Sequence, residues 1–243
     1  MGLHALAFHL PEDAERVSRT LERLFRHDVG SWALTGGLAA ELYWTRLTGQ
    51  TCLRPLNDVD FIVDSFDALP SSLANDFLFR HIHPLDPPGR TLLQSLDSDS
   101  SLRIDVFRAY GAEISRCQKV AWSANRLRLV SIEDLVARSA RLTLDLASNQ
   151  PVPAVHARDF LRLSELVDPA RVEPIWLDHR KKQHPETYRE AYQLLKHLIP
   201  SRQELLVKRE YSRDIAGVCP RCKETPTFRL ADPKVMLSML GYC

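Results

Sequence analysis

Three aspartates in two short hydrophobic segments are the residues best suited to chemistry. Asp58 and Asp60 lie two residues apart in the segment 58–63, and Asp105 lies inside the segment 102–107. Residues two apart on a strand point to the same face, so the three carboxylates converge if the strands are neighbours. Mg²⁺ prefers carboxylate oxygens, and two such ions clamp the attacking and leaving oxygens of a phosphoryl or nucleotidyl transfer. The alternative for acidic residues at this spacing is a solvated strand face.

A glycine pair lies upstream, at the start of a helical pattern. Gly36 and Gly37 follow Thr35 and precede apolar residues at helical spacing. Backbone N–H groups at a helix N-terminus bind anions, and glycines let a phosphate group approach closely. The pair therefore predicts a phosphate cradle followed by a metal site, with a simple tight turn as the alternative.

The hydrophobic pattern indicates the elements that must position these residues. Up to residue 130 it predicts helices at 11–27 and 38–49 and strands at 31–34, 58–63, 77–83, 91–95, 102–107 and 126–130. After Ser131, which begins a capping-box pattern, it predicts helices at 131–146, 154–167, 169–183 and 185–198. We therefore expect an α+β fold divided into an α/β domain (1–130), a helical domain (131–214) and a cysteine-containing tail (215–243).

The composition is that of an ordinary folded protein without a charge bias. Of 243 residues, 44% are hydrophobic and 26% are charged, and 32 Lys+Arg against 31 Asp+Glu leave a net charge of +1. Such a balance gives no global reason to expect a polyanion as partner. Because no apolar stretch is long enough for a bilayer and the N-terminus lacks a signal-peptide pattern, we expect no membrane contact and a cytoplasmic location.

The C-terminal tail contains three of the five cysteines. Cys219 and Cys222 have the Cys-x-x-Cys spacing of half a zinc site, and Cys243 is a candidate third ligand. No second Cys-x-x-Cys motif supplies a fourth ligand. Three interpretations stay open, namely a zinc site completed by a distant histidine, a redox pair, and free thiols.

The order of the motifs resembles the nucleotidyltransferase superfamily related to DNA polymerase β. Its signature is a Gly-Gly or Gly-Ser turn that begins a helix, a strand with Asp-x-Asp and a third acidic strand, here residues 36–37, 58–60 and 105. AbiEii-type nucleotidyltransferases, the toxins of type IV toxin–antitoxin systems, are similar in two further stretches. Their Arg-x-Ser/Thr-x-Asp motif resembles residues 54–58, and their Leu-Glu-Asp-Leu-x-Ala-x-Lys helix with a following Arg-Asp pair resembles residues 131–138 and 158–159. The resemblance covers roughly residues 30 to 165.

The resemblance implies a nucleotidyltransferase-type mixed sheet with flanking helices, followed by a helical C-terminal half. It also implies a two-ion, Mg²⁺-dependent enzyme that transfers a nucleoside monophosphate from an NTP to an acceptor hydroxyl. Asp58 and Asp60 would bind the nucleotide-associated Mg²⁺, and Asp105 would join them at the catalytic Mg²⁺. Asp105 or a metal-bound hydroxide would activate the acceptor hydroxyl.

The same resemblance implies a set of nucleotide-binding residues. The glycine pair would cradle the β- and γ-phosphates, Arg54 and Arg138 would neutralise charge in the transition state, and Asp159 belongs to the same set. Two positions depart from the family pattern, since Leu56 stands where Ser or Thr is usual and Arg138 where Lys is frequent. An arginine can hold a phosphate but cannot act as a base.

The acceptor stays open between an RNA, a protein and a small molecule. Basic residues that could follow an RNA backbone are Arg116, Lys119, Arg126, Arg128, Arg138 and Arg141. Ordinary solvated charges are an equal alternative for them.

Three hypotheses for the function of the chain compete. The first is an active enzyme, which would have an antitoxin protein as partner if it is a toxin. The second is an inactive nucleotidyltransferase fold that binds a nucleotide or a partner, and the third is a scaffold whose cysteine tail is the functional part. Retention of all three aspartates favours the enzyme.

Overall fold

The computed structural model describes residues 11–51, 54–56, 58–66, 69–85, 90–122 and 125–208. Its strands are β1 (Ala33–Thr35), β2 (Asp58–Val63), β3 (Leu78–Leu85), β4 (Arg90–Asp97), β5 (Leu102–Arg108), β6 (Gln118–Trp122), β7 (Asn125–Leu129), β8 (Val152–Pro153) and β9 (Leu206–Val207). Its α-helices are α1 (Pro11–Leu24), α2 (Gly36–Thr48), α3 (Ile132–Thr143), α4 (Ala154–Ser164), α5 (Pro169–His179) and α6 (Tyr188–Ser201). Short 3-10 helices are η3 (Ser71–Asn75), η4 (Glu113–Arg116), η5 (Leu144–Ser148) and η6 (Gln203–Leu205). The expected α+β class, a mixed sheet with flanking helices, is confirmed.

Seven of these strands form one mixed sheet in the order β3-β4-β5-β2-β1-β7-β6. Strand β2 runs parallel to β5 and antiparallel to β1, and β1 runs parallel to β7. The three central strands therefore carry the aspartates and lead into the glycine pair, because β1 ends directly at the start of α2. Strands β8 and β9 form a separate two-stranded sheet.

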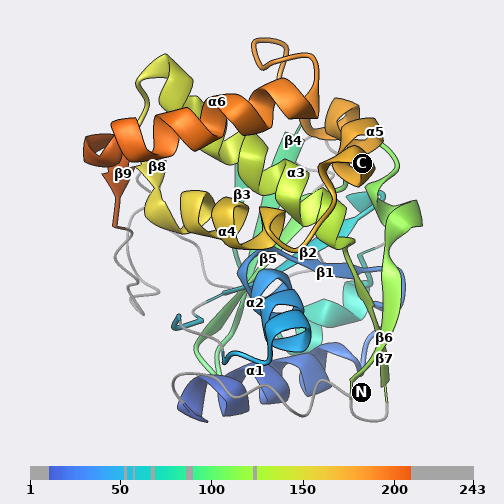
Figure 1. Ribbon diagram of the computed structural model, residues 1–243. Coiled ribbons are helices and arrows are strands. Elements are labelled where there is room, and N and C mark those ends of the chain that lie inside the picture. The colour runs from blue at the N-terminus through green and yellow to red at the C-terminus, as the bar shows by residue number, and fades with distance from the viewer. Residues whose placement is uncertain are drawn as a thin grey trace.

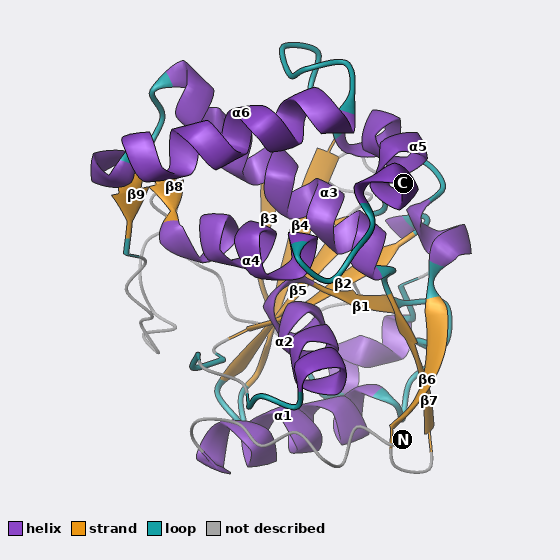
Figure 2. Ribbon diagram, viewed as in Figure 1, coloured by secondary structure: helices purple, strands orange, loops and turns teal. Residues whose placement is uncertain are grey.

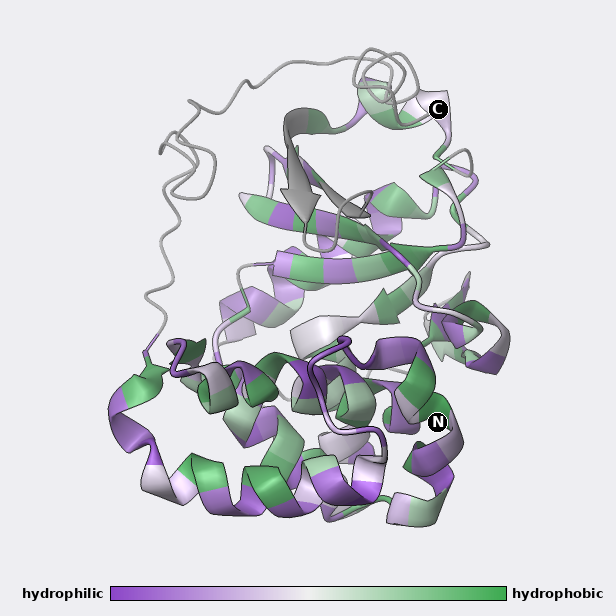
Figure 3. Ribbon diagram, turned by 90° about the horizontal axis from the view of Figure 1, so that it is seen from above, coloured by the Kyte–Doolittle hydropathy of each residue, from purple (hydrophilic) through white to green (hydrophobic). Residues whose placement is uncertain are grey.

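The helices after residue 130 form a packed group. Helix α3 contacts α4, α5 and α6, and α2 contacts β2, α3 and α4. Helix α1 lies at the opposite end of the molecule from α6, with the central strands between them (Figure 1, Figure 2). Hydrophilic and hydrophobic residues alternate along the helices (Figure 3), as they do when one face of each helix enters a core. Within the described residues, no helix combines the length and the apolarity that a membrane crossing needs.

One hydrophobic cluster extends through both parts of the chain. It includes Val17 of α1, Phe61 of β2, Val136 of α3 and Trp176 of α5, each at most 1% exposed. Burying side chains of this size supplies most of the driving force for folding. The core is therefore continuous across residue 130.

The capping box expected after residue 130 forms only in part. The Ser131 hydroxyl accepts a hydrogen bond from the Asp134 N–H and so begins α3. The Asp134 carboxylate accepts a hydrogen bond from the Ser131 hydroxyl, and it also contacts Arg116 and His179. Asp134 therefore takes part in the local cap and connects α3 to other elements.

Several helix boundaries differ by a few residues from the expectation, and one strand was not expected. Helix α5 ends at His179, because Arg180 adopts an extended backbone. Helix α6 begins after Thr187, whose side chain forms a complete capping box with Glu190. Strand β6, which was not expected, pairs with β7 at the edge of the sheet. An edge strand has a neighbour on one side only, so its sequence needs few apolar residues.

Candidate metal and nucleotide site

The three aspartates lie on adjacent strands at the centre of the sheet. Asp60 of β2 pairs in register with Asp105 of β5, and Asp58 pairs with Arg103. Paired residues on neighbouring strands share a face, so all four side chains lie on the same side. Thr35 of β1 is the partner of Asp60 on the other flank. The strands thus bring the three carboxylates together, and they add an arginine.

Arg103 lies between two of the carboxylates. Its Nη2 atom forms an ion pair with Asp58, and its Nε atom lies 2.9 Å from Asp105 Oδ1. Gln94 of β4 makes a longer contact of 3.5 Å with Asp105 Oδ2. Burial lowers the pKa of Arg103, but Asp105 and Asp58 outweigh burial and hold that pKa above its usual value. One permanent positive charge therefore faces three carboxylates.

The three carboxylates of the acidic cluster repel one another more than the nearby arginines offset. Burial, Asp58 and Asp105 raise the pKa of Asp60 to about 8, although Arg103 and Arg138 oppose the rise. Burial also raises the pKa of Asp105 to about 6. Within the described residues, no hydrogen bond or ion pair reaches the Asp60 carboxylate. A divalent cation would relieve this repulsion, and an all-oxygen donor set suits Mg²⁺. The side chains therefore fit that metal.

The glycine pair contacts one acidic and one basic side chain. Gly36 has a φ of +64°, and a Cβ atom added there would lie 1.9 Å from Asp60 Oδ2. A Cβ atom added at Gly37 would lie 2.3 Å from Arg54 Nη2. Glycine permits both approaches, so the start of α2 lies against a carboxylate and a guanidinium. The N–H groups of a helix N-terminus favour an anion at this place.

Arg54 belongs to a cluster around a buried glutamate of α2. Its Nη1 atom donates to Asp159 Oδ2 at 2.8 Å, and its Nε atom lies 3.6 Å from Glu41 Oε1. Glu41 also accepts hydrogen bonds from Arg162 at 2.9 and 3.1 Å, and it lies 3.5 Å from Arg158. Three arginines thus share two carboxylates beside the glycine pair, and Asp159 contacts Arg54 directly.

Arg138 belongs to a different cluster. Its Nη2 atom donates to both carboxylate oxygens of Glu113, at 2.9 and 3.0 Å. Its guanidinium lies over the rings of Tyr110 and Phe107, 5.1 and 5.9 Å from their centroids. The charge of Arg138 lowers the pKa of Asp60. Arg138 therefore acts on the acidic cluster through its field, while its hydrogen bonds hold Glu113.

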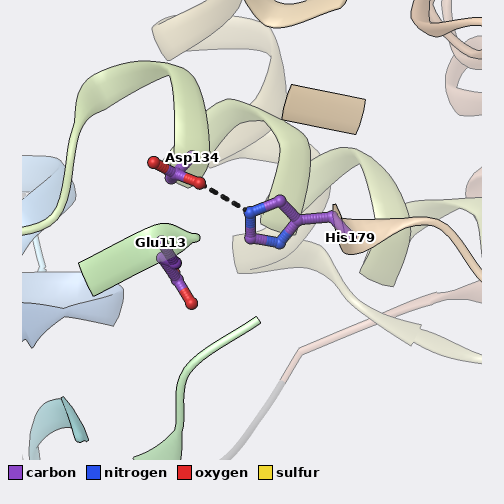
Figure 4. A group of neighbouring side chains, drawn as sticks. All are labelled: Glu113, Asp134 and His179. Carbon is purple, nitrogen blue, oxygen red and sulfur yellow. Dashed lines mark hydrogen bonds and ion pairs between the residues drawn. The ribbon is translucent and has the colours of Figure 1, made fainter. Parts of the chain in front are cut away.

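Glu113, Asp134 and His179 form a second group of buried ligand-type side chains (Figure 4). His179 Nε2 lies 2.9 Å from Asp134 Oδ1, and Arg116 donates to both Asp134 oxygens at 2.9 and 2.7 Å. Burial raises the pKa of Asp134, but hydrogen bonds from His179 and Arg116 outweigh it and lower the pKa to about 2. Each carboxylate of the group faces a guanidinium, since Arg138 holds Glu113. The group is an ionic network that joins η4, α3 and α5.

Most of the basic residues considered for RNA have partners inside the protein. Contacts with carboxylates, a backbone carbonyl or an aromatic ring engage Arg116, Arg128, Arg138 and Arg141. Lys119 and Arg126 are exposed on β6 and β7. Four of the six positions are therefore engaged by contacts within the protein.

The structure describes Leu56, which departs from the Ser/Thr pattern, but not the candidate zinc-binding cysteines of the tail. Leu56 is 3% exposed and belongs to the hydrophobic core, so a buried apolar side chain replaces the Ser or Thr of the family pattern. Cys219, Cys222 and Cys243, the candidate zinc ligands, lie outside the described residues.

Comparison with known proteins gives weak likenesses. No protein-family model matches the chain, and no curated protein matches its sequence. The solved structures that it resembles include JHP933 from Helicobacter pylori, with 14% identity, 77% of this chain and 94% of that chain covered, and a TM-score of 0.29. An antigenic nucleotidyltransferase-like protein from Paracoccidioides brasiliensis shows 15% identity, coverage of 82% and 94%, and a TM-score of 0.39. A further H. pylori protein shows 16% identity, coverage of 84% and 100%, and a TM-score of 0.30. Likenesses at this level assign no family or activity, so function is inferred from the side chains of the site.

Arg103 and Glu41 are site residues that the sequence interpretation missed. Arg103 precedes Asp105 by two residues, so the alternation that places Asp105 on the site face also places Arg103 there. Glu41 follows Gly37 by four residues on α2, and residues four apart share a helix face. Both signals are present in the sequence, but neither indicates which partner each side chain meets.

Proposed function

We propose that this protein is a Mg²⁺-dependent nucleotidyltransferase that transfers a nucleoside monophosphate from an NTP to an acceptor hydroxyl. One arrangement supports the proposal above all. Asp58, Asp60 and Asp105 share one face of the sheet, beside a glycine pair whose other neighbour is the Arg54 guanidinium. Carboxylates for a metal, with N–H groups and a guanidinium for phosphates, are the groups that nucleotide transfer requires.

Each residue of the site has a defined role in this proposal. Asp58, Asp60 and Asp105 would hold Mg²⁺, which when bound neutralises charge on the reacting phosphates. The N–H groups at the start of α2 bind the β- and γ-phosphates, and Arg54 contributes positive charge beside them. Asp159 and Glu41 keep Arg54 in that position through the contacts described above.

The proposed reaction is an in-line displacement at the α-phosphorus. A bond forms between the acceptor oxygen and that phosphorus, the bond to the oxygen bridging the α- and β-phosphates breaks, and pyrophosphate leaves. Asp105 takes the acceptor's proton once Arg103, whose Nε atom lies 2.9 Å from its Oδ1 atom, has moved away. Burial raises the pKa of Asp105 to about 6, and a base whose pKa lies near the working pH transfers protons efficiently.

Incubation with each labelled NTP and Mg²⁺ tests the proposal. We expect pyrophosphate release by the wild type and a loss of about 100-fold or more in Asp60→Asn and Asp105→Asn. Asp64→Asn is a matched control, because Asp64 directly follows β2 and is exposed. If no NTP gives transfer and none changes the melting temperature, the proposal is wrong.

The molecule that carries the label after the reaction identifies the acceptor. Label on the protein, on added RNA or on a small molecule distinguishes the three acceptor classes in one assay.

We also propose the toxin role that the AbiEii resemblance implies, with an antitoxin protein as partner. It predicts that expression of the wild type arrests growth while Asp60→Asn does not, and that a co-encoded antitoxin relieves the arrest.

The ion pairs of Arg103 favour a second candidate function. Its guanidinium lies between Asp58 and Asp105 and supplies a cation from the chain itself. A binding module without catalysis would keep that cation in place permanently. This alternative predicts that an NTP raises the melting temperature without Mg²⁺ and that no pyrophosphate is released.

A further inference from the structure

Arg103 places its own positive charge between Asp58 and Asp105. It is the register partner of Asp58 across β2 and β5, and it precedes Asp105 by two residues on β5. Its guanidinium forms ion pairs with both carboxylates. The reaction proposed above gives this side chain no part beyond moving away from Asp105, although it occupies the centre of the acidic cluster.

The contacts of Arg103 allow its guanidinium to move away from Asp58 and Asp105. Its Nε atom and Asp105 Oδ1 lie 2.9 Å apart, but the two atoms are not aligned as a hydrogen bond. The side chains of Arg103 and Asp58 are 22% and 21% exposed, whereas that of Asp105 is 6% exposed. A long, partly exposed arginine can move its head group toward solvent, while the strands keep the carboxylates in place.

Arg103 and a divalent cation compete for the same carboxylates. Like charges a few ångströms apart repel strongly in a partly buried site, so a metal ion bound to these carboxylates would displace the guanidinium. The displaced guanidinium then needs another anion. Strand β2 lies between β5, which carries Arg103, and β1, which leads to Gly36. A triphosphate bound at the glycine pair would bring phosphate oxygens to this side of the cluster.

We propose that Arg103 is a built-in counter-ion that makes metal binding depend on the nucleotide. The inference rests on the proposed function of the site. Without nucleotide, the guanidinium holds Asp58 and Asp105 and keeps the metal affinity low. When a triphosphate binds, the guanidinium moves to its phosphates and the divalent cation takes the vacated carboxylates. Metal and nucleotide then tighten each other's binding by the same factor. Arg103 is thus a positioning residue.

Titration with Mn²⁺, followed by the EPR signal of the free ion, tests this without turnover. The probes are Mn²⁺ alone and Mn²⁺ with a nonhydrolysable α,β-methylene NTP. For the wild type we expect weak binding of Mn²⁺ alone and an increase in affinity of about tenfold or more with the analogue. For Arg103→Met we expect tight binding of Mn²⁺ alone and little further change with the analogue.

Two variants complete the design. Arg108→Met is the matched control, because Arg108 ends the same strand and is exposed, and its Mn²⁺ affinities should equal those of the wild type. Arg103→Lys serves if Arg103→Met does not fold. An ammonium group lacks the fork that lets a guanidinium bridge two carboxylates, so Arg103→Lys should also bind Mn²⁺ alone more tightly than the wild type.

The outcomes separate this inference from the proposed function. If wild type, Arg103→Met and Arg103→Lys bind Mn²⁺ alone with equal affinity, and Asp60→Asn loses the binding, the inference is overturned and the metal site stands. If none of them binds Mn²⁺ with or without the analogue, the proposed function fails, and the inference fails with it.

Discussion

At the scale of single residues, Gly36 determines how closely the start of α2 approaches Asp60. Its φ is +64°, and an added Cβ atom would lie 1.9 Å from Asp60 Oδ2. We expect Gly36→Ala to lower the free energy of unfolding by about 1–2 kcal/mol for the left-handed backbone and by about 1–3 kcal/mol for the overpacked contact. It should also displace Asp60 and weaken Mn²⁺ binding. Urea denaturation and the EPR titration measure the two effects.

Two other glycines separate these contributions. Gly49 has a φ of +73° but no atom within 4 Å of an added Cβ atom, so Gly49→Ala should show the backbone loss alone, about 1–2 kcal/mol. Gly30 has neither feature, and Gly30→Ala should change stability by less than about 0.5 kcal/mol. Equal losses at positions 36 and 49 would show that contact with Asp60 does not require glycine.

At this scale the sequence predicted which side chains share a face but not what neutralises them. Strand periodicity is local, so the alternation predicted that Asp58 and Asp60 share a face, whereas the position of Asp105 beside them depended on β2 and β5 being neighbours. The partners of Arg138 are different in kind. Its hydrogen bonds to Glu113 depend on how α3 packs against η4, and no local pattern contains that information.

At the scale of elements, Glu41 joins α2 to α4. Its carboxylate is 0% exposed and accepts hydrogen bonds from Arg162 at 2.9 and 3.1 Å, with Arg54 within 3.6 Å. Removal of one partner from a buried ionic cluster leaves an uncompensated charge. We therefore expect Glu41→Gln to lower the free energy of unfolding by about 3–5 kcal/mol. It should also weaken NTP binding, because Arg54 loses a contact that orients it.

Glu15→Gln is the control for Glu41→Gln in the same urea denaturation series. Glu15 pairs with Arg19 one helical turn away in α1, and their side chains are 62% and 66% exposed. An exposed pair of this kind contributes less than about 1 kcal/mol. A loss at Glu41 no larger than the loss at Glu15 would mean that the cluster does not hold the two helices together.

The segment between α5 and α6 should make stability depend on pH. His184 Nδ1 accepts the Lys181 N–H at 3.3 Å, and the ring stacks on Trp176. Burial and Lys181 lower the pKa of His184 to about 4. The unfolded chain, with a pKa near 6.5, therefore binds more protons between pH 6.5 and 4, so this contribution to stability falls as the pH drops through that range.

A comparison with His184→Phe measures this dependence. Phenylalanine keeps a ring beside Trp176 but does not titrate. Between pH 7.5 and 5.5, urea denaturation should show the wild type losing about 1 kcal/mol more than His184→Phe. Parallel losses in the two proteins would mean that other groups produce the pH dependence.

Helices and strands with a strong apolar pattern could be predicted from the sequence, and the edge strand β6 could not. Strand β2 contains four apolar residues in six positions and is central. Strand β6 (Gln118–Trp122) begins with two polar residues, so its apolar pattern is short, and it pairs with β7 at the edge of the sheet. The end of α5 is set by the extended backbone at Arg180, which no capping motif indicates.

At the scale of the whole molecule, the net charge of +1 conceals two clusters of opposite balance. The acidic cluster has three carboxylates around Arg103, and the cluster around Glu41 has three arginines for two carboxylates. They meet at the glycine pair. Composition therefore gave no global reason to expect a polyanion, and the proposed triphosphate site is local, between the two clusters.

The hydrophobic core passes without a break from the sheet into the helices after residue 130. The Tyr43 hydroxyl donates to the Val130 carbonyl at 3.0 Å, and α3 packs against both α2 and α5. Trp32 and Trp176, which lie on either side of residue 130 in the chain, belong to the same buried cluster. Neither part therefore buries its apolar surface without the other.

We accordingly expect the two parts to unfold in one cooperative transition. Variants that keep either Trp32 or Trp176, with the other three tryptophans replaced by phenylalanine, report on each part, because Trp32 packs against Phe61 and Trp176 against Tyr188. The two fluorescence signals should give the same urea midpoint and the same slope. Different midpoints would divide the chain near residue 130 into two units of unequal stability, and the contacts of Tyr43 and α3 would then be a docking surface between them.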